Sequence, residues 1–320
     1  MCRRQQPPRD WGPGMPALSA VGVDTYSYHR LLGEVRDGES HPGVEPITWE
    51  QCVEHAWSCG AEVVAVETCY LEAPGALSTS AVQLLRRPGT MLSWGHPYGL
   101  AFGADAAAAE DVRVWLDFAR RLDHATMRVV VGHPALREGT PAGRDEQMRR
   151  SLTPLRRVAE HAEALGVAVA VENHGDLTAE QLLWLIDEIG SERLGVCFDT
   201  VNALRVGDDL LAAVGALAPR VLAVHLKDIS AQPWHPRSGP TTVIPGEGVL
   251  PLSAVIDVLQ KGGSAPMLLV ELAHFGPGQA DELTMVAASI DAIRGLVGEP
   301  PGSQKPAVSQ KPADGSLPSA

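Results

Sequence analysis

The chain has 320 residues, of which 45% are hydrophobic and 20% charged. This is ordinary globular composition, and it excludes disordered, collagen-like and disulfide-scaffold proteins. A formal net charge of -13 argues against nucleic acid as the main partner, because phosphate binding needs a basic face. No apolar run reaches the roughly 18 residues of a membrane span. We therefore expect neither a nucleic-acid partner nor a membrane.

The cysteines and the first residues of the chain bear on its compartment. Five cysteines are scattered without the close pairs of a zinc site, and their odd number fits a reducing compartment better than a disulfide framework. The arginines near the start are not followed by the apolar segment of a secretory signal. We expect a cytoplasmic protein.

Both ends of the sequence differ in composition from its body. Residues 1–17 mix proline, glycine and charge, which predicts a disordered lead-in. Residues 299–320 contain SQKPA twice and predict a flexible polar tail. The remaining body, residues 18–298, has the size of a single barrel domain.

Eight short apolar runs within the body have the length of strands. Most are hydrophobic without strict alternation, which is typical of parallel strands buried on both faces. The expected strands are 18–24, 62–68, 90–95, 127–133, 167–173, 194–200, 221–228 and 267–273.

Longer amphipathic stretches between these runs predict helices, most clearly over 104–122 and 144–165. Thr48 with Gln51, and Thr178 with Gln181, fit the capping box that begins a helix. Eight strand-then-helix units predict an α/β fold, a single (β/α)8 TIM barrel with flexible N- and C-terminal tails. An open doubly wound sheet is the alternative, but no GxGxxG follows the first strand.

Four ionisable residues end four consecutive predicted strands, where the chemistry of such barrels lies. They are Glu172, Asp199, His225 and Glu271. Three carboxylates and an imidazole converging on one point form a donor set for a single divalent ion such as Mn, Mg, Co or Zn. Without a cation, the close carboxylates would repel one another. The alternative is that each residue ends its strand by chance or forms a local ion pair.

The segments VENHG, FDTVNAL, VHLKD, PGEG and VELAHF resemble the xylose isomerase-like TIM-barrel superfamily of sugar isomerases, epimerases and related lyases. The resemblance implies that Glu172, Asp199, His225 and Glu271 hold the metal, for which manganese is the expected ion. It also implies that Glu172 and Glu271 are catalytic and shuttle a proton between the two faces of a sugar.

One position departs from the family pattern. Many epimerases and the related apurinic endonucleases have a histidine three residues after the sixth-strand aspartate, and this chain has Asn202. The additional histidine ligands of the endonucleases are missing too, so we set DNA repair aside. Asn202 is expected to hydrogen-bond the substrate.

Other candidates lie around the expected site. Lys227 either stabilises a developing oxyanion or pairs with a nearby carboxylate such as Asp228. His133, placed at the end of the fourth predicted strand, is a candidate catalytic base. Further substrate-binding candidates are His96, Tyr26 and Arg237.

These residue types support proton abstraction α to a carbonyl of a keto sugar or related carbohydrate, through a metal-stabilised enediolate. We therefore expect a metal-dependent sugar isomerase or epimerase. A second interpretation is a carbon–oxygen or carbon–carbon lyase that acts by β-elimination on a 3-oxo sugar, like inosose dehydratases or the catalytic subunits of C-glycoside deglycosidases. A third is a non-catalytic metal- and sugar-binding barrel or a partner-dependent subunit. The expected partners are a small-molecule carbohydrate and either further copies of the chain or a small accessory subunit.

Overall fold

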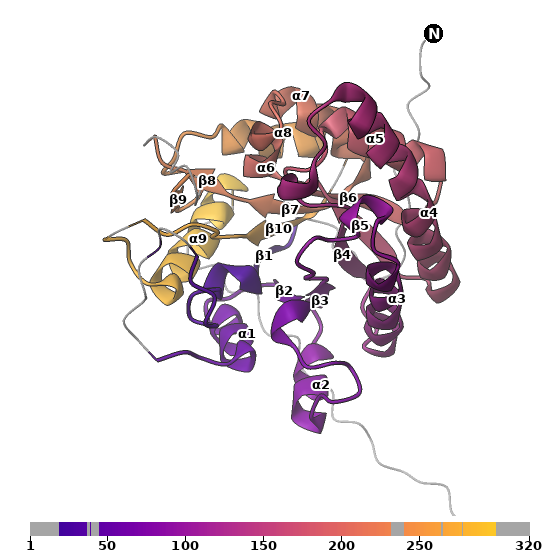
Figure 1. Cartoon of the computed structure of the whole chain (residues 1–320). Helices are drawn as coiled ribbons and strands as arrows, with labels where there is room; N and C mark the ends of the chain where they lie inside the picture. The colour runs from indigo at the N-terminus through magenta and orange to yellow at the C-terminus, as the bar shows by residue number, and fades with distance from the viewer. Residues whose placement is uncertain are drawn as a thin grey trace, which may run out of the picture.

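A computed structural model of the chain describes residues 19–36, 39, 45–231, 240–263, 265–276 and 278–298. Eight parallel strands form a closed barrel with helices packed around it (Figure 1). The strand order around the barrel is β1, β10, β7, β6, β5, β4, β3, β2. The predicted single (β/α)8 barrel is thus confirmed. The lead-in and the tail that the sequence predicts lie outside the described residues.

Each barrel strand overlaps one of the eight predicted runs. The barrel strands are β1 (Val21–Asp24), β2 (Val63–Glu67), β3 (Thr90–Ser93), β4 (Thr126–Val130), β5 (Ala168–Glu172), β6 (Leu194–Asp199), β7 (Val221–Leu226) and β10 (Met267–Val270). A separate antiparallel pair, β8 (Asp228–Ile229) and β9 (Thr242–Val243), was not predicted, because two-residue strands carry no periodicity.

The helices follow the strands in the order expected of the fold. They are α1 (Trp49–Ser58), α2 (Thr79–Leu85), α3 (Ala106–Arg121), α4 (Pro141–Leu165), α5 (Ala179–Ile189), α6 (Thr200–Arg205), α7 (Leu210–Leu217), α8 (Leu252–Lys261) and α9 (Glu282–Leu296). Both predicted capping boxes are formed, at the starts of α1 and α5. None of the helices in the described ranges is both long and apolar enough to cross a membrane.

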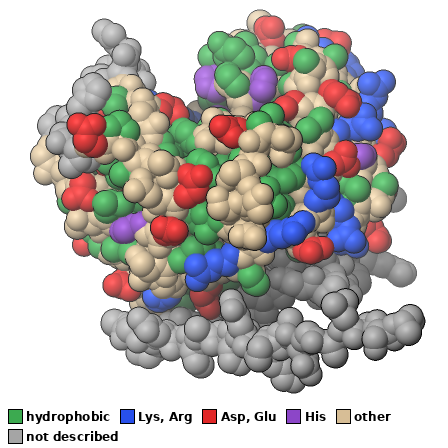
Figure 2. Space-filling view, turned by 90° about the horizontal axis from the view of Figure 1, so that it is seen from below, with side chains coloured by type: hydrophobic (Ala, Val, Ile, Leu, Met, Phe, Trp, Pro, Cys, Tyr) green, Lys and Arg blue, Asp and Glu red, His purple; other side chains and the backbone are tan. Residues whose placement is uncertain are grey.

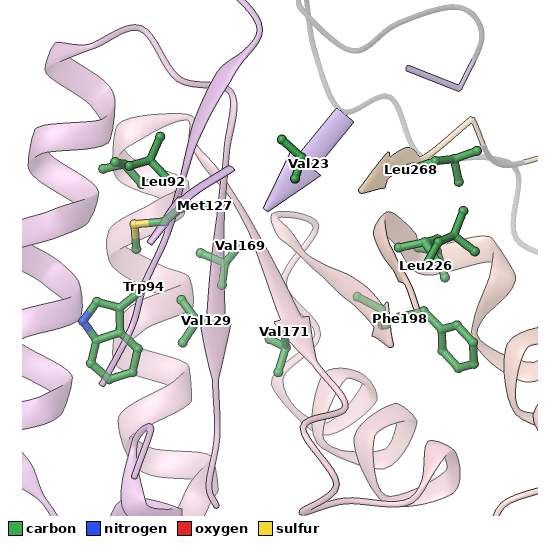
Figure 3. Close-up of a cluster of buried hydrophobic side chains, with 14 of the residues drawn as sticks. Val23, Leu92, Trp94, Met127, Val129, Val169, Val171, Phe198, Leu226 and Leu268 are labelled. Atoms are coloured by element: carbon green, nitrogen blue, oxygen red, sulfur yellow. The ribbon is translucent and has the colours of Figure 1, made fainter. Parts of the chain in front are cut away.

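Side chains along each strand alternate between the helix layer and the barrel interior. On β5, Val169 and Val171 point outward and join the large core beneath the helices (Figure 3). Ala168 and Ala170, which alternate with these valines along the strand, belong to a second and smaller cluster inside the barrel. Gly22 of β1 is also tightly surrounded, since a Cβ there would lie 1.9 Å from a backbone oxygen of β2. Apolar side chains, from alanine to methionine and leucine, therefore fill the lower interior, and polar side chains occupy its upper end.

One predicted strand ends earlier than the sequence suggests. We expected strand four to run to His133, but β4 ends at Val130. Beyond it, the backbone N–H of Gly132 donates to the Asp176 carboxylate of the next loop at 2.8 Å instead of pairing with β5. His133 therefore lies in the loop after β4, and not on the strand.

Figure 2 shows how charged side chains are distributed over one face of the molecule. On the face shown in Figure 2, acidic side chains are interspersed with the basic ones, and the residues coloured there form no continuous basic surface. Such a surface is what phosphate binding along a nucleic acid would require.

Candidate metal centre

Seven of the barrel strands, and the residue directly after the eighth, β10, each contribute one polar side chain to the upper end of the interior. We call these eight residues the polar layer: Asp24, Glu67, Ser93, Arg128, Glu172, Asp199, His225 and Glu271. All eight are buried. Because the strands are parallel and alternate in the same sense, their carboxyl ends bring these side chains together.

The four residues predicted as metal ligands lie together within this layer. One potential ligand atom from each of Glu172, Asp199, His225 and Glu271 lies within 4.8 Å of the others. Glu172 Oε2, Asp199 Oδ2, His225 Nδ1 and Glu271 Oε2 are buried and make no hydrogen bond of regular geometry, although each lies in ion-pair contact with another charged group of the site. Three carboxylate oxygens and one imidazole nitrogen suit a hard or borderline divalent cation. The donor set thus fits a metal ion.

Glu172 is held in place from two sides. The guanidinium of Arg128 lies 2.6 Å from its Oε2, and the Asn202 side-chain amide donates to its Oε1 at 3.1 Å. Arg128 in turn lies 3.2 Å from Glu67 Oε1 and donates to the backbone oxygen of Trp94 at 3.0 Å. The orientation of Glu172 therefore depends on a buried guanidinium shared with a second carboxylate.

Asp199 is fixed by the start of α6. Its Oδ1 accepts hydrogen bonds from the backbone N–H groups of Val201 at 2.9 Å and Asn202 at 2.8 Å, as an N-cap residue does. This leaves Oδ2 directed at the cluster, where Lys227 Nζ lies 2.7 Å away. Helix capping thus decides which carboxylate oxygen is available for a cation.

His225 presents its two ring nitrogens to different neighbours. Nδ1 contacts the Glu271 carboxylate and lies 3.7 Å from Glu172 Oε2. Nε2 lies 3.5 Å from Asp24 Oδ2, while the other oxygen of Asp24 accepts from the Tyr26 backbone N–H at 2.8 Å. A carboxylate behind the far nitrogen is the usual arrangement for a histidine that binds a metal.

The charges of the layer interact strongly. Burial raises the pKa of Glu67 to about 8, despite the neighbouring Arg128. Burial opposes ionisation of Glu271 as well, but Lys227 and His225 hold the pKa of that carboxyl well below its usual value. For Lys227, burial is outweighed by Asp199 and Glu271, which raise its pKa. The lysine is therefore charged and Glu67 is largely protonated near neutral pH.

The layer contains more negative than positive charge. Its carboxyl groups belong to Asp24, Glu67, Glu172, Asp199 and Glu271. These five carboxyl groups face three basic side chains, those of Arg128, Lys227 and His225. A divalent cation bound among the carboxylates would reduce this imbalance.

Two further candidates contact the predicted ligands directly. Lys227 Nζ lies 2.7 Å from both Asp199 Oδ2 and Glu271 Oε1, so it pairs with these carboxylates and not with Asp228. Asp228 instead accepts backbone hydrogen bonds from the PGEG segment. Asn202 is bound to Glu172, and its expected contact with substrate stays a prediction.

The remaining candidates lie outside the cluster. His133 is in the loop after β4, with its ring 5.9 Å from that of His174. His96 stacks on Trp94 at 5.2 Å between ring centroids. Tyr26 donates its hydroxyl hydrogen bond to Glu34 at 3.0 Å. Arg237 lies outside the described residues. None of the three described candidates has a hydrogen bond to the four predicted ligands among the contacts of the described ranges.

Sequence reasoning missed four members of the polar layer, namely Asp24, Glu67, Ser93 and Arg128. The first two carried the same signal as Glu172, since VGVD and VVAVE also end an apolar run with a carboxylate. Arg128 was signalled differently, by a single charge inside the apolar strand TMRVV. A buried strand tolerates such a charge only when it is paired.

Comparison with known proteins places this architecture in a family. A sequence model of the xylose isomerase-like TIM barrel matches residues 54–296. The chain belongs to this family. Its barrel is similar to a solved structure of L-ribulose 3-epimerase, with a TM-score of 0.63 at 18% identity over 87% of this chain and 94% of the other. At that identity, the likeness concerns the fold.

Curated relatives are similar to the chain over parts of their length. The chain is 25% identical to 3-oxo-isoapionate decarboxylase of Pectobacterium atrosepticum over 66% of this chain and 69% of the relative. It is 23% identical to inosose dehydratase of Lacticaseibacillus casei over 43% of this chain and 50% of the relative. The matched segments span 30% to 69% of the length of the curated relatives.

Proposed function

We propose that the chain is a divalent-metal-dependent enzyme that removes a proton α to the carbonyl of a keto sugar or related carbohydrate, as a sugar isomerase or epimerase. The observation that carries this proposal is the cluster of four buried potential ligand atoms from Glu172, Asp199, His225 and Glu271, which all lie within 4.8 Å of one another. We propose these four as the ligands and manganese as the natural ion. A cation bound there would polarise a chelated carbonyl and acidify the adjacent C–H.

The two glutamates are placed to move the proton. They belong to β5 and to the residue after β10, with β6 and β7 between these strands, so they approach the cluster from different sides. Lys227 keeps Glu271 in the ionised form, which a general base must have before it can accept a proton. Glu172, oriented by Arg128 and Asn202, would return a proton on the other face.

Lys227 has two tasks in this proposal. Its ammonium pairs with both Asp199 and Glu271 and so offsets the repulsion between these two carboxylates. It also places a positive charge where the enediolate oxygen develops negative charge. His133 remains a proposed second base, and His96, Tyr26 and Asn202 remain proposed substrate contacts.

A lyase is the second candidate function. It is favoured by the two curated relatives above, a decarboxylase and a dehydratase, whose names describe the loss of a group from the substrate. The same metal site and base would then expel a group β to the carbonyl of a 3-oxo sugar instead of returning the proton. A cytoplasmic location, and association with further copies or a small accessory subunit, also stay predictions.

The first test measures the metal. Protein prepared with Mn²⁺ is expected to retain about one ion per chain by elemental analysis, and Glu271→Gln and His225→Ala are expected to lose it while keeping the wild-type circular dichroism spectrum. Glu180→Gln and His161→Ala, which alter surface positions on α5 and α4, serve as matched controls. Unchanged occupancy in both ligand variants would contradict the assignment.

The second test measures the chemistry. Metal-loaded protein incubated with ketoses and 3-oxo sugars in deuterated water is expected to place deuterium α to a carbonyl, as detected by NMR. Conversion to an isomer supports the isomerase, and release of water or a leaving group supports the lyase. Bound metal and a sugar-induced thermal shift without deuterium incorporation across the panel would instead indicate a binding barrel or a subunit that needs a partner.

A further inference from the structure

The loops after the barrel strands surround the polar layer, and one arginine lies among three of them. Arg205 ends α6, and its Nη2 donates to Nε2 of His274, in the loop after β10, at 3.0 Å. Its aliphatic stem passes beside Gly175, where an added Cβ would lie 3.3 Å from Arg205 Cδ and 3.4 Å from Pro134. Arg205 thus joins the loops after β4, β5 and β10 at the barrel mouth.

This guanidinium has no acidic partner. Within the part of the chain that the structure describes, no carboxylate oxygen lies within 4.0 Å of Arg205, and its hydrogen-bond partner is an imidazole. The other arginine near the barrel axis, Arg128, is paired with two carboxylates. Arg205 therefore retains donors for a ligand.

The acidic groups around the mouth are already engaged with other donors. Glu34 accepts hydrogen bonds from two tyrosine hydroxyls, at 3.0 and 2.9 Å. Glu39 pairs with His29 and accepts backbone N–H groups. Asp176 accepts three backbone N–H groups. None of these three carboxylates forms an ion pair with Arg205 within the described residues.

Two histidines near Arg205 have neutral rings. His274 accepts from Arg205 through Nε2 and so orients the guanidinium, while its proton is on Nδ1, which is buried on the other side of the ring. His133 accepts from the Ala135 backbone through Nδ1, which leaves the proton on Nε2. Burial, together with Arg36 and Arg205, lowers the pKa of both histidines, that of His274 to about 3. They are thus uncharged N–H donors at neutral pH.

Arg205 is exposed to solvent, and a guanidinium that lacks a carboxylate partner and lies near a free imidazole N–H is an arrangement that can recognise an anion. An anionic group would pair with the Arg205 charge, whereas a neutral sugar would not. We propose that the substrate carries an anionic group, a carboxylate or a phosphate, which Arg205, oriented by His274, binds together with His133 while the carbonyl end lies at the four-ligand cluster. This inference rests on the proposed function and narrows its substrate to keto sugar acids or keto sugar phosphates.

The test uses pairs of non-reacting compounds that differ at one end. Titration calorimetry of the metal-loaded full chain compares D-gluconate with D-glucitol, and ribitol 5-phosphate with ribitol. One anion is expected to bind at least about tenfold more tightly than its polyol, and the better pair distinguishes carboxylate from phosphate. Because an aldonate can also bind the metal through its carboxylate, the decisive measurement is made on Arg205 variants.

Arg205→Gln is expected to weaken binding of that anion by about 10- to 100-fold, the usual loss for a hydrogen bond to a charged group, and to leave the polyol unaffected. Arg205→Lys should retain part of the preference. Arg113→Gln, on the exposed face of α3, is the matched control. Unchanged anion affinity in Arg205→Gln, equal affinity for anion and polyol, or no binding of the four compounds at millimolar concentration would overturn the inference.

Metal content is measured in the same samples. Protein that fails to hold the ion would contradict the proposed function itself. Protein that holds one ion per chain but shows no anion preference would contradict the anionic substrate alone.

Discussion

The buried carboxylate of Asp24 lies where it can set which ring nitrogen of His225 is turned toward the candidate metal site. Asp24 is fully buried, one of its oxygens is fixed by the Tyr26 backbone, and the other lies 3.5 Å from His225 Nε2. A carboxylate in this position favours a proton on Nε2, which would leave the lone pair of Nδ1 for a metal ion bound beside Glu271 and Glu172. Asp24 therefore acts through the histidine as a positioning residue.

Asp24→Asn is expected to weaken metal binding by about 10- to 100-fold, the usual effect of removing such a carboxylate. Calorimetry measures the affinity, and ¹⁵N NMR of the histidine side chains should report a changed tautomer population for His225. Asp209→Asn, at the start of α7, is a control that alters only a helix cap. An affinity equal to wild type would show that Asp24 does not orient His225.

Arg128 is the residue on which the stability of the apo protein should depend most. It lies between Glu67 and Glu172, and its removal leaves two buried carboxyl groups without their cation. We expect Arg128→Leu to lower the free energy of unfolding by about 3 to 5 kcal/mol in urea titrations, whereas Arg113→Leu on the surface should change it by less than about 0.5 kcal/mol. A loss no larger than that of the surface variant would rule out a stabilising role.

At the scale of secondary-structure elements, the sequence predicts the strands well because each is an apolar run of strand length between turn residues. The helix starts are equally legible, since Thr48 and Thr178 carry their capping partners three residues ahead. The end of β4 was missed, because the hydrogen bond from Gly132 to Asp176 joins segments 44 residues apart. Local sequence patterns do not predict contacts between residues that lie so far apart in the chain.

Only half of the polar layer was predicted, for a related reason. Glu172, Asp199, His225 and Glu271 were identified as a set because they end four consecutive strands and include a histidine. Asp24 and Glu67 also end strands, but no predicted ligand follows them on the neighbouring strand β3. Which carboxylates carry protons could not be predicted at all, because the pKa of Glu67 depends on burial and on Arg128.

The loop after β1 is fastened to the loop after β10 by one carboxylate. Glu39 contacts His29 at 3.1 Å and accepts the Phe275 backbone N–H at 2.9 Å. Burial would raise the pKa of Glu39, but the hydrogen bond and charge of His29 lower it from 4.5 to about 2. A carboxyl with a lowered pKa in the folded state stabilises that state above its unfolded pKa.

This contribution is expected to be complete above pH 4.5 and to disappear as the pH falls toward 2. Urea unfolding of wild type and Glu39→Gln across this window measures it. The difference in the free energy of unfolding between the two proteins should shrink as the pH falls, and a difference independent of pH would contradict the role of the Glu39 charge.

At the scale of the whole molecule, the excess of carboxyl groups in the barrel is expected to couple metal binding to folding, so that a bound ion stabilises the folded state. Burying more carboxylates than cations costs free energy, which a bound divalent ion would offset. We expect Mn²⁺ to raise the thermal unfolding temperature and a chelator to lower it. An ion present at 100 times its dissociation constant would add about 2.7 kcal/mol to the free energy of unfolding.

The same titration on His225→Ala provides the control, since that variant should show little or no thermal shift with Mn²⁺. An equal shift in the variant would place the stabilising ion somewhere other than the polar layer.

The pairing of β1 with β10 also constrains the order of assembly. Val21 lies beside Leu268 and Val23 beside Val270, so the first strand to leave the ribosome must wait for the last one before the barrel can close. Glu271 directly follows that last strand. Neither the closed barrel nor the full set of candidate ligands can therefore exist on a nascent chain until almost the entire body has been synthesised.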